Sequence, residues 1–211
     1  MTTGSLDEAY AYCVSVARRH YENFPVASWL LPRAMRPHIA AIYAFARAAD
    51  DFADQPDRAP DERIRLLGEW QTKLHRAVRG EPQDDPVFVA LANTIHRLNL
   101  PAQLFDDLLS AFRQDVTVHR YDSWDAVMDY CRRSANPVGR LLLRVAGIRN
   151  DDANRASDAL CTALQLVNFW QDFGVDWSNG RLYVPREVSD AVGARDEDLT
   201  AGKMTGPWKR R

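Results

Sequence analysis

Apolar residues recur every three or four positions along most of the 211-residue chain, which is the spacing of amphipathic α-helices. Prolines, glycines and short polar residues divide this pattern into segments. No two alternating segments are joined by a tight turn, so a β-hairpin is not expected. The pattern predicts helices at residues 6–20, 37–54, 61–79, 86–98, 101–118, 123–147 and 151–177, and the start of another within "EDLTAGKMTGPWKRR".

Several of these helices have recognisable end signals. Pro37 and Pro101 suit the first turn of a helix, where the missing N–H has no partner to lose. Asp61 and Ser123 can cap helices, because their side-chain oxygens accept hydrogen bonds from the free N–H groups of a first turn. Pro137 lies inside the sixth helix and is expected to kink or break it. Together these signals predict an all-α fold.

The composition is compatible with one helical domain over residues 1–211. Hydrophobic residues make up 46% and charged residues 27% of the chain, which is typical of globular proteins. The net charge is only -2, so a nucleic-acid partner is not expected. The chain has no apolar run of about 18 residues, no signal peptide and only three widely spaced cysteines. A cytoplasmic protein with reduced thiols is the expectation.

Two acidic stripes interrupt otherwise apolar helices. Asp50 and Asp54 are one turn apart and point the same way, whereas Asp51 is rotated from them by about 100°. The second stripe has the same interval of four and consists of Asn168, Asp172 and Asp176. A single aspartate of this kind is most simply explained as part of a solvated helix face. Two stripes in aromatic and aliphatic surroundings favour a shared site.

If both stripes faced one cavity, their carboxylates would repel one another and would need cations. Oxygen ligands without Cys or His at metal spacing favour Mg²⁺ over Zn²⁺. Mg²⁺ held by a few carboxylates usually completes its shell with water and phosphate oxygens. The spacing therefore predicts a diphosphate substrate bridged by Mg²⁺ to two facing helices. The sequence patterns of EF-hands, P-loops and ferritin-like di-iron sites are missing.

Polar residues next to the stripes fit the same interpretation. Arg47 precedes Asp50 by one turn and can donate to phosphate oxygens. Tyr43 lies one turn before Arg47, and Gln165 lies three residues before the second stripe. Arg181 and Tyr183 follow that stripe across the "SNG" turn. Each has a structural alternative as a surface arginine, a core tyrosine or a helix-face glutamine, but the set as a whole favours a binding site.

The segments "YAFARAADDFAD" and "LQLVNFWQDFGVDWSNGRLYVP" resemble the two aspartate-rich motifs of the squalene and phytoene synthases, the head-to-head prenyl synthases. The resemblance runs from about Leu6 to Pro185, and the second motif is the more specific. It implies an isoprenoid synthase fold, a helical bundle around a central apolar cavity with Mg²⁺ and diphosphate at its mouth. The charged, uncapped last stretch suggests that the C-terminal helices of that fold are missing, so the domain is expected to be shortened.

The resemblance implies a role for each matching position. The implied metal ligands are Asp50, Asp51, Asp54, Asn168, Asp172 and Asp176. The implied diphosphate-binding residues are Arg47, Gln165, Asn168 and Arg181. The implied catalytic residues are Asp50, Asp54, Asp172, Asp176, Tyr43 and Tyr130. Asp115, in "FRQDV", matches another polar position of the family.

Two places depart from the common family pattern. Many members have phosphate-binding serines after the first helix, where this chain has Tyr21 and Asn23. Many have an arginine before the middle aspartate of the second motif, where this chain has Gln171. Both differences remove groups that would help to bind two diphosphates. The segments "HYENFPVASWLLP" and "YCRRSANPVGRL" resemble the hydroxysqualene synthases of the bacterial hopanoid pathway, which implies presqualene diphosphate as the substrate.

The implied reaction is Mg²⁺-dependent ionisation of presqualene diphosphate, rearrangement of the cation and capture by water to give hydroxysqualene. Rings that could stabilise the cation are those of Phe24, Tyr43, Tyr130 and Phe169. Asp115, Tyr130 and Asn136 are candidates for positioning the water, by location alone. Two alternatives remain open: a condensing squalene or phytoene synthase that uses two prenyl diphosphates, and an inactive, truncated helical partner subunit.

A lipid substrate and product also imply a peripheral membrane contact. The most apolar segment outside the predicted helices is "FPVASWLLP" at residues 24–32, for which a buried connection over the core is the simpler interpretation. Enzymes upstream and downstream in the same pathway are the other partners that the resemblance implies.

Overall fold

The computed structural model describes residues 3–19, 31–55, 57–203 and 205–209, and within them the fold is helical. Tyr21, Asn23, Phe24 and most of the 24–32 segment lie outside the described residues. The long helices are α1 (Thr3–Arg19), α3 (Arg36–Asp54), α4 (Pro60–Val78), α5 (Pro86–Leu98), α6 (Ala102–Thr117), α7 (Trp124–Ser134), α8 (Asn136–Val145) and α9 (Asp151–Gln171). The shorter ones are α10 (Phe173–Ser178), α11 (Arg186–Ala191), α12 (Asp196–Thr200) and α13 (Gly206–Lys209). The all-α prediction is confirmed.

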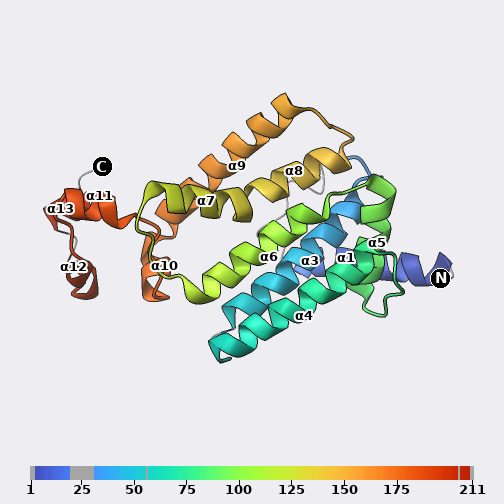
Figure 1. Cartoon of the computed structure of the whole chain (residues 1–211), viewed down its shortest axis with the longest axis horizontal. Coiled ribbons are helices and arrows are strands. Elements are labelled where there is room, and N and C mark those ends of the chain that lie inside the picture. The colour runs from blue at the N-terminus through green and yellow to red at the C-terminus, as the bar shows by residue number, and fades with distance from the viewer. Residues whose placement is uncertain (1–2, 20–30, 56, 204, 210–211) are drawn as a thin grey trace.

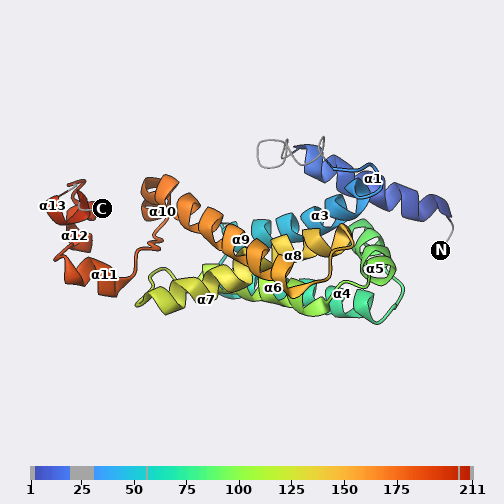
Figure 2. The same ribbon diagram turned by 90° about the horizontal axis from the view of Figure 1, so that it is seen from above.

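Helix α3 forms the centre of the main helical layer and packs against α1, α4, α5 and α6 (Figures 1 and 2). Phe45 of α3 is fully buried. Its ring lies 6.0 Å from that of Trp70, 6.0 Å from that of Phe88 and 5.4 Å from that of Phe105, measured between centroids. Burying a side chain of this size contributes about 1.5–3 kcal/mol, so this aromatic cluster fixes α3 relative to its neighbours.

Helices α7 and α8 follow one another, and α9 runs back across them (Figure 1). The break between α7 and α8 lies at Ala135, and Pro137 occupies the first turn of α8, as the prediction for Pro137 required. Arg140 of α8 forms an ion pair with Asp158 of α9 at 2.5 Å. Among the residues of α9, Phe169 alone is buried, so most of this helix lies at the surface.

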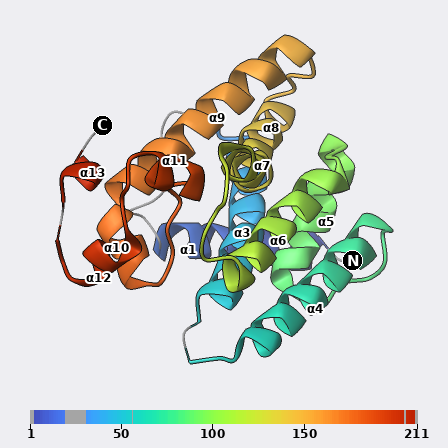
Figure 3. The same cartoon turned by 60° about the vertical axis from the view of Figure 1, so that its left-hand side comes forward.

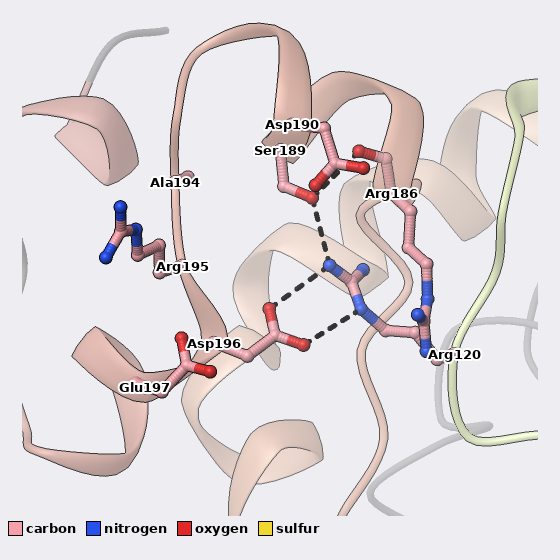
Figure 4. A pocket seen from close by; sticks show the side chains of 8 residues that line it. All are labelled: Arg120, Arg186, Ser189, Asp190, Ala194, Arg195, Asp196 and Glu197. Carbon is pink, nitrogen blue, oxygen red and sulfur yellow. Dashed lines mark hydrogen bonds and ion pairs between the residues drawn. The ribbon is translucent and has the colours of Figure 1, made fainter.

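The segment from α11 to α13 lies at the end of the molecule opposite to the N-terminus (Figures 1 and 3). An isolated parallel bridge joins Arg120, in the loop after α6, to Leu182. The Arg120 side chain then donates hydrogen bonds to Asp196, to the Ser189 hydroxyl and to the Val184 carbonyl. Figure 4 shows its guanidinium between Asp196 and Ser189. This arginine therefore fixes the C-terminal segment to the helical body.

The sequence located most helices correctly but misplaced three local features. Asp61 does not cap α4, because Pro60 already starts that helix and Ala59 is the capping residue. Pro101 precedes α6 as its capping residue instead of lying in its first turn. The predicted seventh helix is divided at Asp172, whose φ of -94° and ψ of 8° separate α9 from α10.

The Ser123 cap is confirmed, since its hydroxyl accepts from the Ala126 N–H at 3.3 Å. Among the described residues, no helix has the length and apolar character needed to cross a membrane.

Candidate active site

The first acidic motif lies in the last turn of α3. Arg47 contacts the carboxylate of Asp50 at 3.3 Å and that of Asp51 at 2.6 Å. The pKa of Asp50 is raised to about 6, because burial and then the nearby Asp54 carboxylate raise it more than Arg47 lowers it. Helix ends of this polarity favour cations, and this last turn contains no basic residue. The motif is therefore a place of concentrated negative charge.

The second motif spans the junction of α9 and α10. The Asn168 side-chain amide donates to the Asp172 carboxylate at 2.7 Å. The backbone N–H of Asp172 donates to the Asn168 carbonyl at 2.9 Å, and that of Asp176 donates to the Asp172 carbonyl at 2.8 Å. The four-residue steps of the stripe thus persist across the interruption of the helix. Burial, and then the Asp172 carboxylate, raise the pKa of Asp176.

Arg181 brings the two motifs together. Its guanidinium donates to the Asp54 carboxylate at 2.9 Å, across 127 residues of sequence. The backbone N–H of Arg181 donates to the Asp176 carbonyl at 2.8 Å. The negative charge of Asp54 also contributes to the raised pKa of Asp176, which places the two acidic motifs within electrostatic reach of each other. The sequence marked Arg181 as a phosphate-binding residue; in the structure its side chain pairs with the Asp54 carboxylate.

Aromatic residues and one buried acid lie beside the motifs. The rings of Phe169 and Tyr183 are stacked with centroids 3.8 Å apart, and the ring of Tyr130 lies 5.7 Å from that of Tyr183. Asp115 of α6 is only 9% exposed and faces the Tyr130 hydroxyl, which donates to its carboxylate. Burial raises the pKa of Asp115 to about 7, although Tyr130 and Arg181 both lower it. Burial likewise raises the pKa of Tyr130 well above its usual value.

Two of the remaining predicted residues lie on the helices of the two motifs, and the third, Asn136, lies on α8. Tyr43 is half-buried on α3, and burial raises the pKa of its hydroxyl while the nearby Arg47 lowers it. Gln165 is half-buried on α9, one turn before Asn168. Asn136, the third candidate for positioning water, is buried at the start of α8 and accepts a hydrogen bond from Thr162 at 3.0 Å. Its side chain therefore has a structural partner.

A cavity of about 830 Å³ opens beside the second motif, between α9–α10 and the C-terminal segment. Asp176 and Gln171 lie on its wall, which is otherwise mainly apolar and includes Trp124, Leu166, Phe169, Trp170, Phe173 and Trp208. Sequence reasoning did not single out Trp124 or Trp208 for this wall, because they belong to segments that meet the second motif only in the folded chain. A smaller pocket of about 230 Å³ surrounds the Arg120 contacts of Figure 4.

The residues of the two motifs have the right chemistry for Mg²⁺. Their donors are carboxylate and amide oxygens, and burial, followed by repulsion from neighbouring carboxylates, raises the pKa of Asp50 and of Asp176. Among the described residues, however, no three His, Cys, Asp or Glu side chains stand close enough to hold a metal ion as they are. The ion pairs of Arg47 and Arg181 account for part of this spacing, since they direct three carboxylates towards guanidinium groups.

Comparison with known proteins gave consistent matches. The family model described as squalene/phytoene synthase matches residues 17–210. The chain is 45% identical to the hydroxysqualene synthase of Zymomonas mobilis, over 84% of this chain and 59% of the relative. It is 44% identical to the hydroxysqualene synthase of Sinorhizobium fredii, over 90% of this chain and 64% of the relative. The chain therefore spans about three fifths of the length of these curated relatives.

Two solved structures resemble the whole described fold. The crystal structure of squalene synthase HpnC from Alicyclobacillus acidocaldarius matches with a TM-score of 0.89 and 41% identity, covering 98% of this chain and 77% of that chain. A dehydrosqualene synthase in complex with a ligand matches with a TM-score of 0.81 and 27% identity, covering 92% of this chain and 67% of that chain.

Proposed function

The chain belongs to the squalene/phytoene synthase family and has its isoprenoid synthase fold, and from this premise we propose that it converts presqualene diphosphate to hydroxysqualene with release of diphosphate. The relatives named hydroxysqualene synthase, at 44% and 45% identity, support this reaction over others of the family. The observation that carries the proposal is the contact of Arg181 with Asp54, which unites two acidic motifs beside an apolar cavity.

The residues that would hold Mg²⁺ are Asp50, Asp51, Asp54, Asn168, Asp172 and Asp176. When bound, the metal would neutralise carboxylate charge and polarise the diphosphate oxygens of the leaving group. Asp50 must be ionised for this purpose, and its pKa of about 6 leaves it mostly charged at neutral pH. The donor set supports a hard, oxygen-preferring divalent cation.

The side chains proposed to bind the diphosphate are those of Arg47, Gln165, Asn168 and Arg181. Guanidinium groups form charge-assisted hydrogen bonds with phosphate oxygens, and they stabilise the negative charge that grows as the carbon–oxygen bond breaks. Arg47 and Arg181 come from opposite motifs, so a diphosphate between them would be held from both sides. This arrangement suits a single diphosphate.

The aromatic residues beside the motifs are proposed to stabilise the carbocation. Tyr130, Phe169 and Tyr183 present ring faces and edges close to the acidic residues, and a cation is attracted by the faces of such rings. The apolar cavity next to Asp176 is large enough for part of a long hydrocarbon. An apolar wall limits the access of bulk water to the carbocation. The cation is then captured by a single bound water, which gives hydroxysqualene.

Condensation of two prenyl diphosphates is the alternative function. Relatives named phytoene synthase share 33% identity with the chain, for example that of Mycobacterium tuberculosis. Gln171 stands where a phosphate-binding arginine is common in condensing members, and it lies on the cavity wall. The loss of this cation favours a one-diphosphate reaction.

The test is a product assay with two substrates. The chain is incubated with presqualene diphosphate and Mg²⁺ without a nicotinamide, and hydroxysqualene and released diphosphate are measured. Farnesyl diphosphate as the sole substrate tests the alternative.

The Asp172→Asn variant is expected to lose about 100-fold or more in turnover, because an electrostatic group at the leaving diphosphate is removed. Asp57→Asn, an exposed change just beyond α3, is the control. Absence of diphosphate release from presqualene diphosphate would rule out the proposed reaction for this chain.

A further inference from the structure

Two arginines pair with the three aspartates of the first acidic motif in this structure. Arg47 contacts Asp50 at 3.3 Å and Asp51 at 2.6 Å, and Arg181 contacts Asp54 at 2.9 Å. Each of the three aspartates therefore has a guanidinium partner. These are the same two arginines that the proposed function assigns to the diphosphate.

The backbone of Arg181 is hydrogen-bonded to the second motif, and its side chain pairs with an aspartate of the first motif. Its backbone N–H is bonded to the Asp176 carbonyl at 2.8 Å, after a turn in which Gly180 adopts a positive φ of 79°. Its side chain, which is 21% exposed, crosses from there to Asp54. Arg181 is thus a positive charge placed between the two groups of carboxylates, where the proposed function requires a divalent cation.

Resting on the proposed function, we propose that Arg181 is a stand-in cation that exchanges partners when the substrate binds. In the free protein its guanidinium neutralises Asp54. When a divalent cation binds at the carboxylates, it replaces the guanidinium, and Arg181 turns to the diphosphate. Arg47 can make the same exchange from Asp50 and Asp51 on its own helix. Arg181 is then a residue that couples metal binding to diphosphate binding.

The coupling follows from what each ligand must displace. A divalent cation alone has to compete with a guanidinium already paired with Asp54. A diphosphate alone has to compete with the carboxylate for the same guanidinium. When both ligands bind, each releases the partner that the other needs, so each strengthens the binding of the other by the same factor.

The test measures binding without turnover, using Mn²⁺ as the metal probe. Mn²⁺ alone is titrated into wild-type protein and Arg181→Gln, and free Mn²⁺ is followed by electron paramagnetic resonance. The variant is expected to bind Mn²⁺ about 5-fold or more tightly than wild type, at the low end of typical coupling factors. In isothermal titration calorimetry with the preformed Mg²⁺–pyrophosphate complex, the same variant is expected to bind about 5-fold or more weakly.

Three controls separate exchange from a general charge effect. Arg186→Gln removes one positive charge from the neighbouring helix α11, where the side chain is exposed and pairs with Asp122 at 3.4 Å. It should leave Mn²⁺ binding unchanged. Arg181→Lys retains the charge and should keep Mn²⁺ binding weak. In an Asp54→Asn background, Arg181→Gln should lose most of its effect on Mn²⁺ affinity.

Each result either supports or overturns the partner exchange of Arg181. Equal Mn²⁺ affinity in wild type and Arg181→Gln, or an equal gain in Arg186→Gln, would overturn the exchange. Thermal unfolding monitored by circular dichroism checks that Arg181→Gln is folded. If it is not, Asp54→Asn replaces it: with no carboxylate to displace, this variant should bind pyrophosphate without metal more tightly than wild type, and equal affinity would overturn the exchange. The Mn²⁺ result is also independent of the reaction: tighter Mn²⁺ binding in a chain that releases no diphosphate would retain the exchange and reject the proposed function.

Discussion

Asp50 and Asp54 end a helix at the point where its dipole disfavours negative charge, and burial of Asp50 adds a second unfavourable term. Neither effect helps the fold. The two carboxylates are tolerated because Arg47 and Arg181 supply positive charge from different parts of the chain. Groups kept in such unfavourable surroundings are concentrated at functional sites, so their placement is better explained by binding than by stability.

The stability of the chain should depend on pH through Asp115. Its pKa is about 7 in the folded chain and has an ordinary value of 3.8, so the folded chain binds this proton more tightly. The group therefore lowers stability increasingly as the pH rises from 4 to above 7. Asp115→Asn removes this charge and keeps an oxygen that can accept from Tyr130. At pH 8 its melting temperature is expected to exceed that of wild type by roughly 3 °C or more.

The measurement is thermal unfolding of wild type and Asp115→Asn at pH 8 and pH 5. The difference in melting temperature should shrink at pH 5, because the folded wild type is then mostly protonated at this position. Asp57→Asn, which makes the same substitution at an exposed position, is the control. A variant that is less stable than wild type at pH 8 would contradict the prediction.

The packing of α8 on α9 depends on Gly139. A Cβ at this position would lie 2.2 Å from the Ser157 hydroxyl oxygen and 2.6 Å from the Cys161 sulfur. Both side chains would have to rotate or the helices would have to separate, so Gly139→Ala is expected to cost about 1–3 kcal/mol in the free energy of unfolding. Gly68→Ala in α4 meets no atom within 4 Å and should stabilise the protein by about 0.5–1 kcal/mol.

Urea unfolding of Gly139→Ala and Gly68→Ala measures both changes. Adding Ser157→Ala to Gly139→Ala removes the nearest oxygen and should recover part of the loss. Equal stability of Gly139→Ala and wild type would mean that Ser157 and Cys161 rotate away without cost.

Proline and polar capping residues made most helix ends predictable. Pro86 and Leu98 bound α5 as expected, and Pro137 divides the sixth predicted segment into α7 and α8. The break at Asp172 had no comparable signal, because this residue is neither proline nor glycine. The hydrogen bonds from Asp172 to Asn168 and from Asp176 to Asp172 keep helical spacing through the break, so the sequence pattern stays continuous there.

The spacing of the aspartates located both motifs, but it did not predict the contact between them. The ion pair of Arg181 with Asp54 joins residues 127 positions apart, and it depends on how α10 and its following turn are placed against α3. The cavity wall has the same dependence, since Trp124 and Trp208 belong to distant segments. Periodicity reports which face of a helix is apolar. It does not report which two faces meet.

Arg120 controls this long-range arrangement. Its side chain is 12% exposed and joins the loop after α6 to Asp196, Ser189 and the Val184 carbonyl, on both sides of α11. Arg120→Ala would leave these acceptors without their donor, with an expected loss of about 1–3 kcal/mol in the free energy of unfolding. The segment at residues 182–196 should loosen first, and it begins one residue after Arg181.

Hydrogen–deuterium exchange followed by mass spectrometry tests this prediction. In Arg120→Ala, exchange should increase for residues 182–196, whose backbone N–H groups at Leu182 and Arg186 donate to His119 and Tyr121 at 2.9 Å in wild type. Helices α3 to α6 should retain their protection, because Arg120 lies outside their core. Arg186→Ala, which changes an exposed arginine of the same segment, is the control. Uniform loosening of the whole chain would contradict a local role, whereas loosening confined to 182–196 with weaker binding of Mg²⁺–pyrophosphate would show that Arg120 positions Arg181.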